Sequence, residues 1–165
     1  MKKQISTVQT EANIKEILRS LSETVERLAA LSKGLSETKL QEPLGKDERS
    51  FTEALGHLIN TEAISSEAIH LALMLNEPIL PDVHAERDLG KLLRFDLLPF
   101  SELMMYFATR RTVLLRILAS LSEDQWSRCI RENGKQREES VYWRARGLAL
   151  HELEHLQDLE FKLSK

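Results

Sequence analysis

The chain has 165 residues, 42% of them hydrophobic, which is enough to bury the core of a single domain spanning residues 1–165. Its 23 basic and 26 acidic residues give a formal net charge of −3 with the two signs mixed along the chain, which argues against a nucleic-acid partner. One cysteine excludes an internal disulfide, and no apolar run approaches the roughly 20 residues of a membrane span, so we expect a cytoplasmic protein with no membrane partner.

The first half of the chain predicts two amphipathic helices. Apolar residues recur there with a period near 3.6, and no segment of useful length alternates apolar and polar residues as a half-buried strand does. The first helix covers about residues 10–31, and Gly34 with the SETKLQEPLG stretch marks its end and a loop. The second covers about residues 50–76, with Ser50 as N-cap and Glu53 completing a capping box.

The second half predicts two more helices after a long connection. Residues 77–96 contain two prolines and a glycine, and this segment is long enough to cross one end of a bundle. The third helix covers about residues 97–121, and the fourth covers about residues 139–163 after a turn at Asn133-Gly134. We therefore predict an all-α fold, a single four-helix bundle with a long connection between its second and third helices.

Three of the five histidines fall on helix faces that also carry apolar residues. On the fourth helix, one line of residues at steps of three or four includes both His151 and His155. The corresponding line on the second helix includes His57, whereas His70 and His84 lie off these lines and are expected on the surface or in a loop. The pattern predicts that three imidazoles point inward.

If these three histidines bind one metal ion, their positions along the helices determine whether the two helices are parallel or antiparallel. His57 follows the expected start of its helix by about seven residues, and the other two precede the end of theirs by about eight to twelve, at about 1.5 Å of rise per residue. Antiparallel helices would bring the three to one height, whereas parallel helices would leave His57 roughly 7–14 Å away. A shared ion, about 2.0–2.1 Å from each nitrogen, therefore requires antiparallel helices.

Two explanations of the three histidines remain open. An i, i+4 pair with a third imidazole from a facing helix makes a three-nitrogen set that leaves coordination positions open, as a catalytic metal requires. However, a pair of this spacing occurs by chance in about one such chain in seven. The alternative is a group of core histidines hydrogen-bonded to one another, to Thr61 or to Asp158.

The stretch HELEH, residues 151–155, also matches the zinc-peptidase signature H-E-x-x-H. That chemistry needs a third protein ligand, which is either a histidine six residues past the second one or a glutamate on a later helix. This chain has Phe161 at the first position, and the ten residues after His155 leave no room for a later helix. We therefore reject the peptidase interpretation. Glu152 is then expected to be solvated, with a role as general base or as a supporting partner of a metal ligand as the alternative, and Asp158 is the better candidate to orient an imidazole. Both are weak catalytic candidates.

Three stretches together resemble the DinB-like family of metalloenzymes. They are ERSFTEALGHLINTEA (48–63), FATRRTVLLRILASLSEDQWSR (107–128) and LALHELEHLQDL (148–159). The resemblance covers about residues 10–163 and implies a four-helix bundle that holds zinc or nickel on His57, His151 and His155. This chain differs from the family pattern at Ser50-Phe51, where many members have a Trp-Ser pair, and at Glu154, where many members have another histidine.

What the resemblance implies about activity is thiol chemistry. Its best-understood members are a mycothiol-dependent maleylpyruvate isomerase and bacillithiol S-transferases, in which the metal activates a low-molecular-weight thiol. The first hypothesis is therefore a metal-dependent transferase of this type, acting on a small-molecule substrate. The second is a metal-dependent hydrolase assisted by Glu152 or Asp158. The third is a non-catalytic, stress-induced helical protein that binds a metal or forms a homodimer through a helix face.

Overall fold

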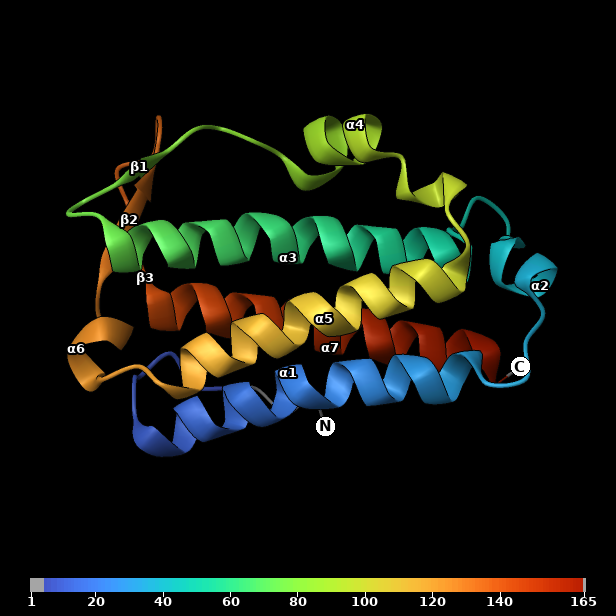
Figure 1. Ribbon diagram of the computed structural model, residues 1–165, viewed down its shortest axis with the longest axis horizontal. Helices are drawn as coiled ribbons and strands as arrows, with labels where there is room; N and C mark the ends of the chain where they lie inside the picture. The colour runs from blue at the N-terminus through green and yellow to red at the C-terminus, as the bar shows by residue number, and fades with distance from the viewer. Residues whose placement is uncertain (1–4, 165) are drawn as a thin grey trace.

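Four long helices form the body of the molecule in the computed structural model, which describes residues 5–164 (Figure 1). They are α1 (Glu11–Ser32), α3 (Phe51–Met74), α5 (Phe100–Ala119) and α7 (Val141–Leu163). The predicted four-helix bundle is confirmed, and every long helix lies within three residues of its expected bounds. None of the helices among these residues is both long enough and apolar enough to cross a bilayer.

Local side-chain chemistry sets where these helices begin. The predicted capping box at α3 is present, because the Ser50 side chain accepts a hydrogen bond from the Glu53 backbone and the Glu53 carboxylate accepts one from Ser50. The expected start of α5 was three residues too early. Pro99 disfavours a helical conformation in the residue before it, and Leu98 is accordingly extended, so α5 begins only at Phe100.

The direction of the helices follows from the lengths of their connections. In Figure 1, α1 and α7 run one way and α3 and α5 run the opposite way. The connection from α3 to α5 must therefore return along the whole bundle, and we call these residues, 75–99, the crossover segment. It lies along the outer side of α3 and contains a π-helix, η1 (Ala85–Gly90), followed by α4 (Lys91–Leu93) and a 3-10 turn, η2 (Phe95–Leu97).

The remaining short elements lie at the two ends of the bundle (Figure 1). Two of them are single helical turns in stretches expected to be loops or breaks, α2 (Glu37–Gln41) and α6 (Glu123–Trp126). A small sheet has the order β1 (Ile79–Leu80), β2 (Cys129–Glu132), β3 (Glu138–Ser140), with β1 parallel to β2 and β2 antiparallel to β3.

The sheet corrects the expectation that the chain has no strands. Its strands are two to four residues long, too short to display the alternation that identifies a strand in a sequence. The turn between β2 and β3 was expected, and Gly134 there adopts a φ of 80°, a conformation that glycine reaches without steric cost.

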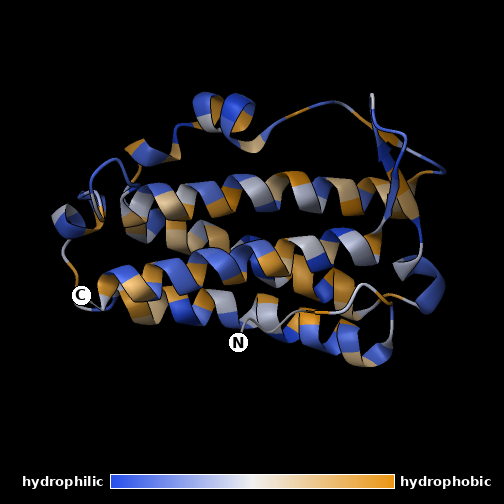
Figure 2. Ribbon diagram, turned by 180° about the vertical axis from the view of Figure 1, so that it is seen from behind, coloured by the Kyte–Doolittle hydropathy of each residue, from blue (hydrophilic) through white to orange (hydrophobic). Residues whose placement is uncertain are grey.

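The core consists of two apolar clusters separated by a buried polar layer. The bundle helices are amphipathic, alternating hydrophobic and hydrophilic residues along their length (Figure 2). Each of the four helices contributes to both apolar clusters, and a layer of four buried polar residues, one from each helix, lies between them: Thr24, Glu62, Arg111 and Glu152. All four side chains are buried, so their polar and charged groups require partners within the protein.

In this layer the Arg111 guanidinium contacts the three other bundle helices. It donates to Glu62 on α3 at 2.8 Å, to both carboxylate oxygens of Glu152 on α7 at 2.5 and 2.9 Å, and to the Leu21 carbonyl on α1 at 2.6 Å. Thr24 donates to Glu152 at 2.8 Å. The two carboxylates keep the pKa of Arg111 above its usual range despite burial, so it carries the positive charge that both glutamates need.

Candidate metal centre

Three imidazoles meet at the interface between α3 and α7. The Nε2 atom of His57 lies 3.1 Å from Nε2 of His151 and 3.1 Å from Nε2 of His155. The Nε2 atoms of the latter two, one helical turn apart on α7, are 3.2 Å apart. All three residues predicted as metal ligands are therefore brought together through the same ring nitrogen.

The helix directions needed for this meeting are the predicted ones, because α3 and α7 are antiparallel (Figure 1). The depth of the histidines was predicted less well. They are half-buried at the rim of the α3–α7 interface, whereas the most deeply buried side chains of the last helix, such as Glu152 and Leu156, face the bundle axis. The rim position leaves one side of the cluster accessible from outside the bundle.

The separations between the nitrogens fit metal ligation better than mutual hydrogen bonding. Each Nε2 has one in-plane lone pair or hydrogen, so three mutual contacts cannot all be hydrogen bonds. Tetrahedral or octahedral ligation, at about 2.0–2.1 Å from each nitrogen, places ligand atoms about 2.9–3.4 Å apart. The observed 3.1–3.2 Å falls inside that range. The cluster therefore suggests a divalent metal site.

Glu86 fixes the protonation of His57. Its Oε1 lies 2.5 Å from Nδ1 of His57, and its Oε2 lies 3.3 Å from the Arg49 guanidinium. Burial opposes ionisation, but the hydrogen bond from His57, together with the positive charge of Arg49, lowers the pKa of Glu86. An ionised carboxylate only accepts hydrogen bonds, so Nδ1 of His57 holds the hydrogen and its Nε2 presents a lone pair to the cluster.

The crossover segment positions Glu86. Nδ1 of His84 accepts hydrogen bonds from the backbone of Glu86 and Arg87, and Asp88 accepts one from the backbone of His84, so the side chains at the start of η1 hold its first turn together. His84 is exposed in this segment, as expected for a residue outside the cluster. Glu86 was not predictable from the sequence, because it lies in an irregular stretch with no periodic pattern.

The histidines of α7 are kept neutral. Burial, followed by the neighbouring His155 and His57, lowers the pKa of His151 to about 4. Burial and the nearby His57 and Arg49 also lower the pKa of His155. Neutral imidazoles have the lone pair that a metal ligand needs. Nδ1 of His151 is buried without a hydrogen-bond partner among the described residues, so no contact there selects its tautomer.

The two carboxylates proposed for catalysis do not face the cluster. The expectation that Glu152 is solvated is wrong, since its side chain is 0% exposed and paired with Arg111 on the bundle axis. A polar residue next to His151 in the sequence favours exposure, but the face of α7 that carries Glu152 is buried. Asp158 pairs with Lys162 at 2.6 Å instead of orienting an imidazole, a role that Glu86 fills for His57.

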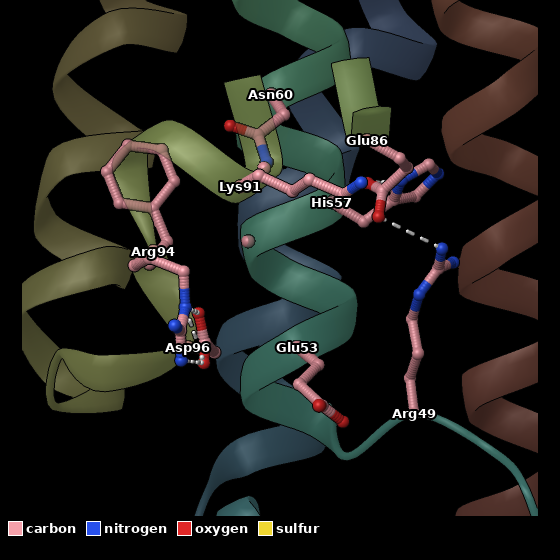
Figure 3. Close-up of a pocket in the computed structure, with 11 residues that line it drawn as sticks. Arg49, Glu53, His57, Asn60, Glu86, Lys91, Arg94 and Asp96 are labelled. Carbon is pink, nitrogen blue, oxygen red and sulfur yellow. Dashed lines mark hydrogen bonds and ion pairs between the residues drawn. The ribbon is translucent and has the colours of Figure 1, made fainter. Parts of the chain in front are cut away.

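Two hollows flank the histidines. His57 lines a cavity of about 470 Å³ between α3 and the crossover segment, shown in Figure 3. His151 lines a second hollow of about 260 Å³, which we call the α3–α7 groove and which Thr61, Trp143 and Gly147 also line. A Cβ atom added at Gly147 would meet nothing within 4 Å, so the groove is open at this point.

Known proteins resemble this chain in fold and in sequence pattern. YfiT from Bacillus subtilis, described as a probable metal-dependent hydrolase with an unusual four-helix bundle topology, is similar with a TM-score of 0.83 and 12% identity, over 95% of this chain and 89% of that one. At this identity the likeness concerns the fold alone. No curated protein sequence matches the chain significantly. The sequence profile of the DinB superfamily matches residues 20–159, which include all three clustered histidines, and the chain therefore belongs to the DinB superfamily.

Proposed function

We propose that this protein is a divalent-metal-dependent enzyme and that His57, His151 and His155 hold the ion. The observation that carries the proposal is the convergence of their three Nε2 atoms at 3.1–3.2 Å. Zinc and nickel both suit a set of imidazole ligands. When bound, such an ion supplies a Lewis acid that polarises a substrate group and lowers the pKa of a bound water or thiol.

Hydrolysis is the reaction class that we place first. It is supported by the fold shared with YfiT, whose description is that of a probable metal-dependent hydrolase. In this chain, three imidazole ligands add no negative charge to the centre, so a divalent ion there would keep its full positive charge. The site therefore favours substrates and intermediates that carry negative charge. Glu86 contributes by holding His57 in the orientation and protonation state that ligation requires.

Thiol transfer is the second candidate, and the positions of Glu152 and Asp158 favour it. A hydrolase needs a group that accepts a proton from water, but these two carboxylates are paired with Arg111 and Lys162. A thiol has a pKa near 8.5, about seven units below that of water, and loses its proton near a metal without a protein base. The related isomerase and S-transferases named above work with such thiols.

Metal analysis of the purified protein tests the shared part of both candidates. We expect about one divalent ion per chain in the wild type and a large loss in the His57→Ala, His151→Ala and His155→Ala variants. His70→Ala is the matched control, because His70 lies on α3 outside the cluster. An unchanged metal content in the three cluster variants would leave the third hypothesis, a non-catalytic helical protein.

Cobalt substitution separates the two reaction classes. If the protein activates thiols, titration of the cobalt form with small thiols produces a sulfur-to-metal band that His57→Ala abolishes. If it is a hydrolase, a panel of ester, amide and phosphoester substrates includes one that turns over without any thiol. The expected homodimer stays a prediction, which sedimentation velocity of the metal-loaded protein would test.

A further inference from the structure

The outer face of α5 carries an exposed stripe along most of the helix. α5 packs against α1 and α3, and no segment of the described chain lies in front of it in Figure 1. Residues at steps of three or four share one face of a helix. On α5 the exposed residues at such steps, which we call the α5 stripe, are Glu102, Met105, Tyr106, Thr109, Thr112, Val113 and Arg116.

The middle of the α5 stripe is suited to burial against another molecule. Met105, Tyr106 and Val113 are 67%, 45% and 40% exposed, although the outer face of a bundle helix is usually polar. The hydroxyls of Thr109 and Thr112 each donate, at 2.9 Å, to the backbone carbonyl four residues earlier in α5. Covering these threonines would therefore leave neither hydroxyl donor without a partner. Neighbouring apolar side chains exposed in this way indicate an interaction surface.

The two ends of the α5 stripe carry opposite charges. Glu102 lies in the first turn of α5, and Arg116 lies in its last turn. Both are exposed, and among residues 5–164 neither side chain forms an ion pair or a side-chain hydrogen bond. They are 14 residues apart, or about 21 Å along the helix, so they cannot pair with each other. Each of them is available to an opposite charge on another molecule.

The α5 stripe is complementary to itself. Glu102 and Arg116 each lie seven residues from Thr109, and Met105 and Val113 each lie four residues from it. If two antiparallel copies of α5 are related by a two-fold axis at Thr109, each residue faces the one equally far on the other side of Thr109. Glu102 then faces Arg116 of the second copy, and Met105 faces Val113 of the second copy. One arrangement therefore pairs acid with base and apolar with apolar.

A hollow beside the first half of the α5 stripe has room for part of a second copy. Its volume is about 540 Å³, and its walls come from the crossover segment and from α5, including Phe95, Leu98, Met105 and Tyr106. In the antiparallel arrangement, the second half of α5 of the other copy passes over this hollow. By symmetry, each copy both offers a hollow and fills one.

We propose that two copies of this chain form a homodimer through the α5 stripe, with their α5 helices antiparallel and a two-fold axis at Thr109. The small side chain at the crossing point lets the helices approach to the distance of about 8–10 Å typical of packed helices. The pair of Glu102 and Arg116 forms twice, once at each end of the interface. A parallel dimer would instead place like charges together. The interface lies apart from the α3–α7 interface that holds the three histidines, so the proposal is independent of the metal-dependent function.

Charge reversal tests the pairing of the two ends. In sedimentation velocity of the full chain over a range of concentrations, we expect the wild type to dimerise. Glu102→Arg and Arg116→Glu should each weaken the dimer at least about tenfold, because each change places like charges together at both ends of the interface. Combining the two changes should restore most of the affinity, since opposite charges face each other again. Glu26→Arg, the same change at an exposed site on α1, is the matched control and should dimerise as the wild type does.

The combined variant also separates the interface from the helix itself. An acid in the first turn and a base in the last turn both suit the dipole of α5, so the dipole alone makes the combined variant the least stable of the three in thermal unfolding. The interface makes it the best dimer of the three. A wild type that stays monomeric would overturn the proposal and leave this face to a different protein. Single variants that dimerise as the wild type does, or a combined variant that dimerises no better than either single one, would also overturn it.

Disulfide cross-linking tests the position of the axis. The variants carry Cys129→Ser, because Cys129 is itself exposed. Thr109→Cys places two thiols at the axis, where mild oxidation should join the two copies. Thr112→Cys is the matched control on the same face, since its two copies are about 9 Å apart along the helices, beyond the roughly 7 Å between Cα atoms that a disulfide spans. Cross-linking of Thr109→Cys alone supports the axis, and equal cross-linking of both variants, or none of Thr109→Cys, would overturn it.

Discussion

Glu86 and His57 are 29 residues apart along the chain, yet their side chains are 2.5 Å apart. The contact joins the crossover segment to α3 at the point where three imidazoles converge. It sets the tautomer of His57, and it also makes the position of the crossover segment depend on that of the histidine. Loss of the Glu86 carboxylate should therefore weaken metal binding and also destabilise the crossover segment.

We predict that Glu86→Gln weakens zinc binding about tenfold, within the 10–100-fold range for carboxylates that support histidine ligands. A glutamine no longer supplies the charge that strengthens the hydrogen bond to Nδ1 of His57. Competition with a chromophoric chelator measures the affinity. Asp158→Asn is the matched control and should bind zinc as the wild type does, because Asp158 pairs with Lys162. The reverse ranking would restore Asp158 as the supporting carboxylate.

We predict that Arg111→Met destabilises the fold by about 3–5 kcal/mol, since it leaves buried carboxylates without their main cation. Urea unfolding monitored by circular dichroism measures the change. The triple variant Arg111→Met, Glu62→Leu, Glu152→Leu should recover most of the lost stability, because an apolar layer of similar volume needs no ion pairs. A triple variant that is less stable than Arg111→Met would show that the layer is more than a set of compensated charges.

The metal-free protein should lose stability as the pH falls from 6.5 to about 4. His151 has a pKa of about 4 in the folded state against an ordinary 6.5, so within this window the unfolded chain binds a proton that the folded chain does not. The free energy of unfolding then falls by at most about 1.4 kcal/mol per pH unit, and by less because solvent screens a partly exposed group. His151→Gln should have a shallower slope in urea unfolding across the same window. Equal slopes for the wild type and His151→Gln would contradict the assignment of this pH dependence to His151.

We predict that Gly147→Leu blocks the α3–α7 groove without disturbing the fold or the metal. The added side chain enters open space, and replacing a helical glycine should raise stability by about 0.5–1 kcal/mol. If substrates approach His151 through this groove, turnover of the bulkier ones should fall severalfold while zinc content stays unchanged. Gly134→Ala is not a suitable control, because the φ of 80° there is strained for alanine. Gly147→Ala serves instead, since one methyl group leaves the groove open.

The periodic part of the structure was predictable from the sequence. The i, i+4 spacing of His151 and His155 and the apolar line through His57 identified the three residues that converge, and the same lines fixed which helices had to be antiparallel. These predictions succeeded because helix geometry converts spacing along the chain into direction in space. The small sheet was not predictable in this way, since β1 has only two residues and pairs with a strand about 50 positions away.

The misjudged residues depended on contacts between segments distant in the sequence. Glu86 lies in an irregular segment, and nothing near it in the sequence indicates a histidine partner. Glu152 was different, because a signal existed. Arg111 falls on the apolar line of its helix between Phe107 and Leu114. A cation that faces the core needs an anion that also faces the core, because a buried charge requires a partner. The neighbours of Glu152 in the sequence do not indicate this partner, whereas the balance of charges on the inward-facing helix lines does.

The buried layer around Arg111 has a consequence for the axial register of the helices. Its guanidinium holds Glu62 of α3 and Glu152 of α7 at the same time, so a slip of one helix past the other by a single turn, about 5.4 Å, would break at least one of the two ion pairs. Apolar side chains alone tolerate such sliding far better than paired charges do. Glu152 directly follows His151, so the layer that fixes the register lies next to the site that depends on it. The glutamate that suggested a peptidase base instead aligns the two helices whose histidines meet.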